Sequence, residues 1–479
     1  MHLGLTKVPR LCDNVTMPDH SLPTTSRDVL AFPAGFLWGT ATSSHQVEGD
    51  NTNNQWWAWE QQPGRIWHGD KSNLACDWWR NAEADFDRAA ALGQNSHRLS
   101  LEWSRIEPQE GLFDDAALVR YRQMLSGLHE RGLEPMVTLH HFTNPLWLGD
   151  LGEWENRQVV RYFERYAERV VEALGDLVSL WCTINEPAIY ALLSYLRGRF
   201  PPGKRNPVTA FRVLTNVLLG HAAAYRAIHR LQSRARVGLV KSVRGFEPAN
   251  PASPLDRLVA GLQDRLFNDI TLLAAQDGRL RFPLGWGLSR HGPLIDSLDF
   301  VGLNYYTRGL VAFDIQRMSE AFGRDFFQPG AELSDAGQLG PYSEIHPEGL
   351  YVALHKVAAL GKPIIVTENG LPDADDDQRP RFLLSHLAQV HQAIEEGLPI
   401  QGYYHWTLVD NFEWAEGWGL RFGLIELDPE TQARRTRPSG HLYAEICRTN
   451  GITREMARRH GVEQTLFPNT LGIGSTRHD

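Results

Sequence analysis

The chain has 479 residues, of which 42% are hydrophobic and 22% are charged, as in ordinary globular proteins. This composition excludes a wholly disordered, collagen-like or coiled-coil chain. The net charge of −9 predicts no basic surface for nucleic acid or an anionic membrane. No apolar run approaches the ~20 residues of a membrane-spanning helix. Neither nucleic acid nor a membrane is therefore expected as a partner.

The ends of the chain and its cysteines predict one intracellular domain. The first thirty residues contain no continuous apolar segment of the kind that a secretory signal has, so no secretory signal is predicted. Residues 1–30 and 460–479 lack periodicity and are expected to be a poorly ordered extension and tail around a domain at 31–459. The few cysteines lie far apart and favour a reducing compartment, so we expect a cytoplasmic protein. They are Cys12, Cys76, Cys182 and Cys447.

Eight short apolar runs alternate along the chain with longer amphipathic segments. Several runs are continuously apolar, which is typical of parallel strands buried on both faces. Strands that alternate with helices eight times predict an α/β fold, a single (β/α)₈ barrel. The predicted strands are 36–42, 96–103, 134–141, 181–186, 237–243, 298–306, 363–369 and 400–408. The predicted helices are 83–92, 118–131, 158–174, 208–233, 347–359 and 381–396, while 245–255 and 315–340 are interpreted as surface loops.

Polar side chains follow nearly every predicted strand at its carboxyl end. In a (β/α)₈ barrel these ends meet on one face, where active sites are built. We therefore expect the polar residues to line one site, extended by the surface loops. In chain order they are Gln46, Glu48, Arg98, Glu102, His140, His141, Asn185, Glu186, Asn304, Tyr306, Glu368, Asn369, Trp406 and Asp410.

Two of these strand ends carry a glutamate in a similar setting. Glu186 is the fourth residue of the run Thr-Ile-Asn-Glu-Pro at 183–187, and Glu368 lies at the end of a buried strand before Asn369 and Gly370. Either glutamate alone could form a structural salt bridge. Two carboxylates that face each other across a barrel mouth favour glycosidic bond hydrolysis, which needs a proton donor and a nucleophile or base.

Together with Asp-Asn-Phe-Glu-Trp at 410–414, these motifs resemble those of glycoside hydrolase family 1, the β-glucosidase family. The resemblance extends from Phe-Pro-Ala-Gly-Phe-Leu-Trp-Gly at 32–39 to Arg-Arg-Thr-Arg-Pro-Ser at 434–439. It implies a (β/α)₈ barrel, hydrolysis with retention of configuration, and no cofactor or metal.

The resemblance also implies a role for each site residue. Glu186 matches the acid/base of the family and Glu368 matches its nucleophile. Arg98 and Tyr306 match the pair that orients the nucleophile. The remaining matches, which would bind the nonreducing sugar and its surroundings, are Gln46, His141, Asn185, Asn304, Trp406, Glu413 and Trp414. Amide, imidazole and carboxyl groups supply the donors and acceptors that sugar hydroxyls require.

Positions that vary within the family indicate the substrate. Relatives that act on 6-phosphorylated sugars have a small hydroxyl residue in place of Glu413, whose carboxylate would repel phosphate. Tyr342 and Ser343 replace the usual Gly-Trp pair, so the indole platform under the leaving group is expected to be absent.

The predicted enzyme hydrolyses unphosphorylated β-glucosides, with tolerance for galactose or fucose. Its substrates would be small oligosaccharides or aryl and alkyl β-glycosides, and the sequence leaves the oligomeric state open. A transglycosidase and a noncatalytic carbohydrate-binding barrel are the alternatives.

Two candidate metal motifs do not fit. His140 and His141 are neighbours on one strand and point to opposite faces. The acidic run at 373–377 resembles a calcium loop, but Gln378 and Leu384 replace the required Gly and Glu. We interpret this run as a solvated loop.

Overall fold

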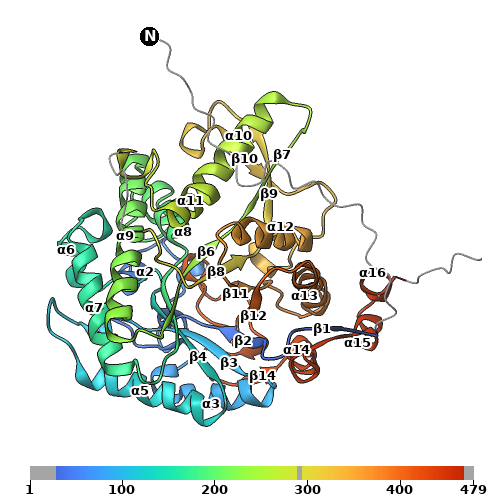
Figure 1. Cartoon of the computed structure of the whole chain (residues 1–479), viewed down its shortest axis with the longest axis horizontal. Coiled ribbons are helices and arrows are strands. Elements are labelled where there is room, and N and C mark those ends of the chain that lie inside the picture. The colour runs from blue at the N-terminus through green and yellow to red at the C-terminus, as the bar shows by residue number, and fades with distance from the viewer. Residues whose placement is uncertain (1–27, 288–293, 469–479) are drawn as a thin grey trace, which may run out of the picture.

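The computed structural model describes residues 28–287 and 294–468, and its centre is a closed barrel of eight parallel strands (Figure 1). Each predicted strand forms one strand of the barrel, and β12 pairs with β2 to close it. The predicted (β/α)₈ barrel is therefore confirmed. The strands are β2 (Leu37–Ala41), β3 (Ser96–Ser100), β4 (Glu134–His140), β5 (Leu180–Asn185), β6 (Arg236–Ser242), β8 (Phe300–Tyr305), β11 (Ile364–Asn369) and β12 (Ile400–Trp406).

The barrel is filled by side chains rather than open. Apolar residues from five different strands belong to one buried cluster: Met136, Leu180, Phe300, Ile365 and Tyr404. A second and larger cluster lies between the strands and the surrounding helices. Strands that contact apolar groups on both faces explain the continuous apolar runs in the sequence.

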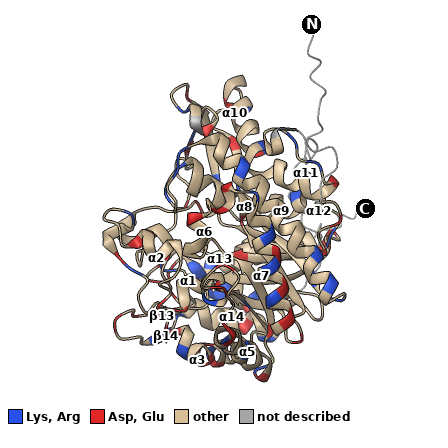
Figure 2. Cartoon of the chain, turned by 90° about the vertical axis from the view of Figure 1, so that its left-hand side faces the viewer, with Lys and Arg blue, Asp and Glu red and all other residues tan. Residues whose placement is uncertain are grey.

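The six predicted helices are all present and surround the barrel. Helix α7 shows why: Phe163, Tyr166 and Val170 repeat at helical spacing and are buried. Arginines and glutamates occupy positions between these buried residues, and Figure 2 shows them as blue and red bands along α7. These helices are α3 (Trp78–Ala91), α5 (Asp115–Glu130), α7 (Val159–Leu174), α9 (Pro207–Leu231), α12 (Pro347–Ala358) and α13 (Arg379–Glu395).

Shorter elements complete the connections between strands and helices. Within the described ranges, no helix has the length and apolar character needed to cross a membrane. The further helices are α1 (Ser44–Val47), α2 (Gln55–Glu60), α4 (Trp103–Ile106), α6 (Leu146–Asp150), α8 (Pro187–Ala191), α10 (Pro254–Asp264), α11 (Ile270–Asp277) and α14 (Pro438–Thr449). Two π-helical turns, η3 (Leu192–Leu196) and η4 (Arg265–Asp269), and the hairpin of β13 (Ile425–Leu427) and β14 (Arg434–Thr436) lie among them.

The prediction that residues 245–255 and 315–340 form surface loops is partly wrong. Strands β7 (Gly245–Pro248), β9 (Arg308–Phe313) and β10 (Gly323–Phe326) form a three-stranded sheet that α10 covers (Figure 1). Val311 of this sheet packs with Val259 and Ala260 of α10. The strands are short, and β7 pairs with β9 about 60 positions further along the chain, so neither loop shows a strand pattern by itself.

The expected ends of the domain also need correction. Strand β1 (Val29–Ala31) pairs with β15 (Gly451–Thr453), so the ordered chain begins before residue 31. After α15 (Arg454–Arg459), helix α16 (Glu463–Leu466) follows, and Leu466 and Phe467 are buried. The expected tail is therefore ordered as far as residue 468, because its apolar side chains pack on the domain. Residues 1–27 and 469–479 of the expected extension and tail lie outside the described residues.

Candidate active site

The carboxyl ends of β5 and β11 each place a glutamate at the barrel mouth. Glu186 directly follows β5, and Glu368 is the fifth residue of β11. Their residues are 8% and 3% exposed, so both carboxyl groups are largely removed from water. Glu186 has left-handed backbone torsion angles (φ 44°, ψ 62°), and Pro187 then begins α8. Such a conformation is uncommon for a residue with a side chain and is found most often at functional sites.

Glu368 is held on both oxygens. Arg98 on β3 donates from Nη1 to Oε1 at 2.6 Å, and the Tyr306 hydroxyl donates to Oε2 at 2.6 Å. Arg98 is fully buried and also donates to Asn185 Oδ1 at 2.7 Å. A charge-assisted bond to a buried arginine is strong and directional. The Glu368 carboxylate is therefore paired and fixed in orientation.

A close backbone contact sets the path of the chain after Glu368. Gly370 lies against the backbone of Trp406, and a Cβ atom at Gly370 would come 2.0 Å from the Trp406 carbonyl oxygen. Only glycine fits there. The residue thus lets the ends of β11 and β12 approach each other beside the site.

Glu186 has different surroundings from Glu368. Its Oε1 accepts a hydrogen bond from Asn304 Nδ2 at 3.0 Å. Burial, followed by the negative charge of Glu368, raises the pKa of Glu186 from 4.5 to about 7. At neutral pH a large fraction of Glu186 therefore carries a proton. One of the two glutamates is paired with a cation, and the other has a raised pKa.

Lys241 is a charged group at the site that the sequence analysis did not select. It lies near the end of β6, is 1% exposed, and donates from Nζ to the Ser242 carbonyl. Burial lowers the pKa of Lys241 to about 7, and the charge of Glu186 opposes that shift. In turn, the ammonium lowers the pKa of Glu186. A lysine after the apolar run Val237–Val240 was the available signal, since this strand was the one without selected polar residues.

The predicted polar residues around the two glutamates form a connected network. Asn185 joins Arg98 to His141, because its Nδ2 lies 3.1 Å from His141 Nε2. Asn304 contacts Glu186 and accepts a bond from Thr367 at 2.7 Å. Burial lowers the pKa of His141 well below its usual value, so the imidazole is neutral. These side chains are fixed by one another before any ligand binds.

A second group of predicted residues lies at the ends of β2 and β12. Gln46 Nε2 donates to Glu413 Oε2 at 3.0 Å. The His141 ring is nearly parallel to the indoles of Trp406 and Trp414, at centroid distances of 5.9 and 6.1 Å. Burial raises the pKa of Glu413 to about 8, and the charge of Glu368 adds to the shift. The structure thus brings all eleven predicted site residues together at one end of the barrel.

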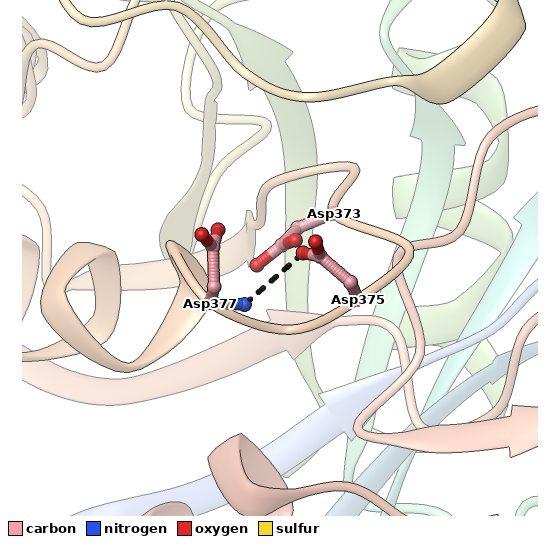
Figure 3. Close-up of side chains that lie close together, drawn as sticks. All are labelled: Asp373, Asp375 and Asp377. Carbon is pink, nitrogen blue, oxygen red and sulfur yellow. Dashed lines mark hydrogen bonds between the residues drawn. The ribbon is translucent and has the colours of Figure 1, made fainter.

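The acidic loop after β11 forms a separate cluster. The carboxylates of Asp373, Asp375 and Asp377 approach within 4.8 Å of one another (Figure 3). Asp375 and Asp377 are exposed, but Asp373 and Asp376 are buried, so the interpretation as a solvated loop is wrong for those two residues. Asp373 accepts hydrogen bonds from three backbone N–H groups of the following turn. These bonds explain its burial: the carboxylate stabilises the turn before α13.

A closed eight-stranded barrel with its polar residues at the carboxyl ends of the strands has the architecture of a barrel enzyme. Residues 29–452 match glycosyl hydrolase family 1, and the chain belongs to this family. Both the predicted family and the predicted class, a glycoside hydrolase, are thereby confirmed.

Relatives of known name cover nearly the whole described domain. Beta-glucosidase A of Thermotoga maritima is 33% identical over 89% of this chain and 99% of its own length. A beta-galactosidase of Pyrococcus woesei is 30% identical over 89% of this chain and 98% of its own. The solved structure of a beta-glycosidase from Pyrococcus horikoshii superposes with a TM-score of 0.82. It is 39% identical and covers 90% of this chain and 98% of its own.

Proposed function

We propose that the protein is a retaining β-glycosidase that hydrolyses unphosphorylated β-glucosides through a covalent intermediate on Glu368. The observation that carries this proposal is the difference between two buried glutamates at one barrel mouth. Glu368 is paired with Arg98 and Tyr306, whereas Glu186 has a pKa near 7. A nucleophile must be ionised and a general acid must hold a proton, and these surroundings suit those two roles.

In the first step, a Glu368 oxygen attacks the anomeric carbon. The bond from that carbon to the leaving oxygen breaks, and the proton of Glu186 moves to this oxygen. The alcohol departs, and the sugar is bound to Glu368 as an ester with inverted configuration.

In the second step, Glu186 acts as a base. The ester has no negative charge, so one cause of the raised pKa of Glu186 is gone and the pKa falls. The deprotonated Glu186 removes a proton from water as the water oxygen attacks the anomeric carbon. The ester bond breaks, and the second inversion restores the β configuration.

The group around Gln46, His141 and Glu413 suits the glycone, because it offers donors, acceptors and indole faces together. With a pKa near 8, Glu413 is largely neutral in the free protein, so charge repulsion of phosphate is weaker than the sequence suggested. The side chains that shift the pKa of Glu413 are neutral or acidic, so this part of the site still disfavours the binding of a phosphate dianion.

Tolerance for β-galactosides and β-fucosides belongs to the same proposal. Beta-galactosidases stand among the relatives, beside the beta-glucosidases. Location in the cytoplasm stays a prediction from the cysteine usage, and the three described cysteines are unpaired and buried.

The test is the stereochemistry and the substrate range of the purified protein. Proton NMR during hydrolysis of an aryl β-glucoside should show β-glucose as the first-formed anomer. The kcat/KM values for the aryl β-glucoside, β-galactoside and β-fucoside should each exceed the value for the 6-phospho-β-glucoside. First-formed α-glucose would contradict the retaining mechanism, and a preference for the phosphorylated substrate would contradict the role of Glu413. Glycosyl transfer to sugar acceptors in place of water would support the transglycosidase alternative.

A further inference from the structure

The parallel aromatic rings of the site continue to a residue outside the eleven predicted ones. The rings of Trp406, His141 and Trp414 are each nearly parallel to the next in this order. His45 adds a fourth ring, because its imidazole lies 6.0 Å from the Trp414 indole, centroid to centroid, at an angle of 13°. His45 belongs to α1, is fully buried, and directly precedes Gln46. The last ring of the series is therefore a buried histidine next to a site residue.

The hydrogen bonds around His45 determine which of its nitrogen atoms carries the proton. Asn54 caps α2, since its Oδ1 accepts a bond from the Trp57 N–H at 2.8 Å. Its Nδ2 group therefore faces His45 and donates to Nδ1 at 3.1 Å. A neutral imidazole that accepts a hydrogen bond at Nδ1 carries its proton on Nε2. The N–H group of His45 is thus at Nε2.

The Nε2 atom of His45 faces the buried carboxyl group of Glu60. Its distance to Glu60 Oε2 is 3.7 Å, both side chains are 0% exposed, and Nε2 has no hydrogen bond within the described residues. Glu60 ends α2 and accepts bonds from the Ser72 N–H at 3.1 Å and the Ser72 hydroxyl at 2.9 Å. Without water, the attraction between an N–H group and a carboxyl oxygen is stronger than in solution. His45 is therefore held between Asn54 and Glu60.

The ring of His45 contacts the residues on either side of Glu413. It is parallel to the Trp414 indole and meets the Phe412 ring edge-on, with 6.0 Å between the centroids in each pair. Gln46, the next residue, donates to Glu413 Oε2 and to the Phe412 carbonyl, both at 3.0 Å. Two consecutive residues of α1 thus hold the same segment, one by ring packing and the other by hydrogen bonds.

The backbone of Trp414 shows why this support matters. Its φ of 50° is left-handed, which costs free energy for a residue with a side chain and persists only where the surroundings impose it. The rings of His45 and Trp56 both pack on Trp414, at centroid distances of 6.0 and 4.7 Å. A displaced His45 ring would therefore let Trp414 relax and would move the neighbouring Glu413.

We propose that His45 is a positioning residue for the glycone: held by Asn54 and Glu60, it orients the rings that flank Glu413 and thereby sets the affinity for the sugar. The proposal rests on the proposed function, because it assigns a residue to the glycone side of the same reaction. It adds the pair of His45 and Glu60 to the site, behind the side chains that would contact the sugar.

The first test is His45→Phe, which keeps a ring and removes both polar contacts. Glucose has no aglycone, so its inhibition constant reports on the glycone region alone. We expect this constant and the KM for an aryl β-glucoside to rise about 2- to 10-fold, the size of one aromatic pair contact. The value of kcat should change by a smaller factor, since Glu186 and Glu368 keep their surroundings. A loss confined to kcat, with an unchanged inhibition constant, would overturn the proposal.

Two further variants control for effects on the fold. His386→Phe makes the same substitution at a buried histidine of α13, which packs on Phe382 at 3.8 Å, and should leave both constants unchanged. An equal rise in this control would overturn the proposal, because any loss of packing would then suffice. If His45→Phe did not fold, His45→Gln would replace it. Glutamine keeps an acceptor and a donor but has no ring, so the same constants should rise.

A double-mutant cycle decides whether His45 acts through Glu413. If it does, His45→Phe should change the affinity for glucose by less than about twofold in a Glu413→Gln background. Equal losses in both backgrounds would overturn the proposal, because independent positions give additive effects.

Binding of glucose without turnover separates this inference from the proposed function. Tryptophan fluorescence can follow the titration, because Trp406 and Trp414 belong to the site. If no β-glucoside were hydrolysed, the proposed function would fail, and weaker glucose binding by His45→Phe than by the unmodified protein would still support the role of His45. Identical titrations of the two proteins would overturn that role, whether or not glucosides were hydrolysed.

Discussion

The ends of β5 and β11 carry the same residue type in similar sequence settings but provide opposite electrostatic environments. At β11, Arg98 and Tyr306 satisfy both oxygens of Glu368. At β5, Glu186 accepts hydrogen bonds from the neutral side chains of Asn304 and Ser242, and burial together with the Glu368 charge raises its pKa to about 7, against the smaller effect of the Lys241 charge. The comparison teaches that the residues around a carboxyl group, and not the strand that carries it, decide its role.

The largest effect should come from removing the nucleophile. Glu368→Ala should reduce kcat on aryl β-glucosides by on the order of 10⁴–10⁶-fold, the range seen when a nucleophile is deleted. The substitution leaves space beneath the anomeric carbon, and Glu186 can still protonate the leaving group. Added azide should therefore restore turnover by a single displacement, which gives the α-glycosyl azide by NMR.

The matched control for this experiment is Glu186→Ala with azide. There the covalent intermediate on Glu368 still forms from an activated substrate, and azide enters from the opposite face to give the β-glycosyl azide. Opposite products from the two variants would sharpen the contrast between the strand ends. A β-azide from Glu368→Ala would show that Glu368 is not the nucleophile.

A smaller loss of kcat/KM is expected when the side chain at position 186 cannot donate a proton. Glu186→Gln should lower kcat/KM by about 10²–10⁴-fold on substrates with poor leaving groups, and less on nitrophenyl glucosides. The unmodified enzyme should lose activity as the pH rises through about 7, because Glu186 then loses its proton. The variant should lack this alkaline limb in its profile of kcat/KM against pH. If the limb persisted, another group would be the acid.

Tyr306→Phe tests the pairing at β11. The variant removes the 2.6 Å bond to Glu368 but keeps the ring that packs against Phe422. A hydrogen bond to a charged group is worth about 1.5–3 kcal/mol, so kcat/KM should fall about 10- to 10²-fold. Thermal unfolding measured in parallel serves as the control for the fold. A kcat/KM equal to that of the unmodified enzyme would mean that Arg98 alone is sufficient to orient Glu368.

The smallest effect concerns Lys241 beside Glu186. Its ammonium lowers the pKa of Glu186, so Lys241→Met should raise that pKa. The acid then keeps its proton to higher pH, and the alkaline limb of kcat/KM should move upward. Lys241→Arg keeps the charge and should leave the limb closer to its original position. A limb that moved downward in Lys241→Met would contradict the electrostatic coupling.

The fold was predictable because local patterns specify it. Short apolar runs, several of them continuous, predicted the eight barrel strands, and helical spacing predicted α7 and α9. The common location of the strand-end residues was predictable because the barrel topology gathers strand ends, so that Asn185 and His141 become neighbours although they are 44 positions apart. These features need no knowledge of side-chain packing.

Other features depend on contacts that one segment does not reveal. The pairing of β9 with β7 and β10 joins separate loops, and the burial of Asp373 depends on the turn that follows it. Lys241 could have been noticed as a charge in an apolar strand, but its effect on Glu186 requires the three-dimensional arrangement. A pocket of about 770 Å³ lined by Ala188, Leu193, Phe211 and Phe267 is formed by the packing of several helices, which no single motif encodes.

The closure of the barrel has a consequence for the order of folding. Strand β2 pairs with β12, Gln46 bonds with Glu413 across 367 positions, and β1 pairs with β15. At ribosomal rates of about 5–20 residues per second, roughly 20–70 s separate the synthesis of β2 and β12. Until β12 emerges, the nascent sheet has an open edge at β2, and such an edge is prone to aggregation. The group of side chains around Gln46 and Glu413 therefore forms last, and slower translation lengthens the time for which the growing chain needs protection by chaperones.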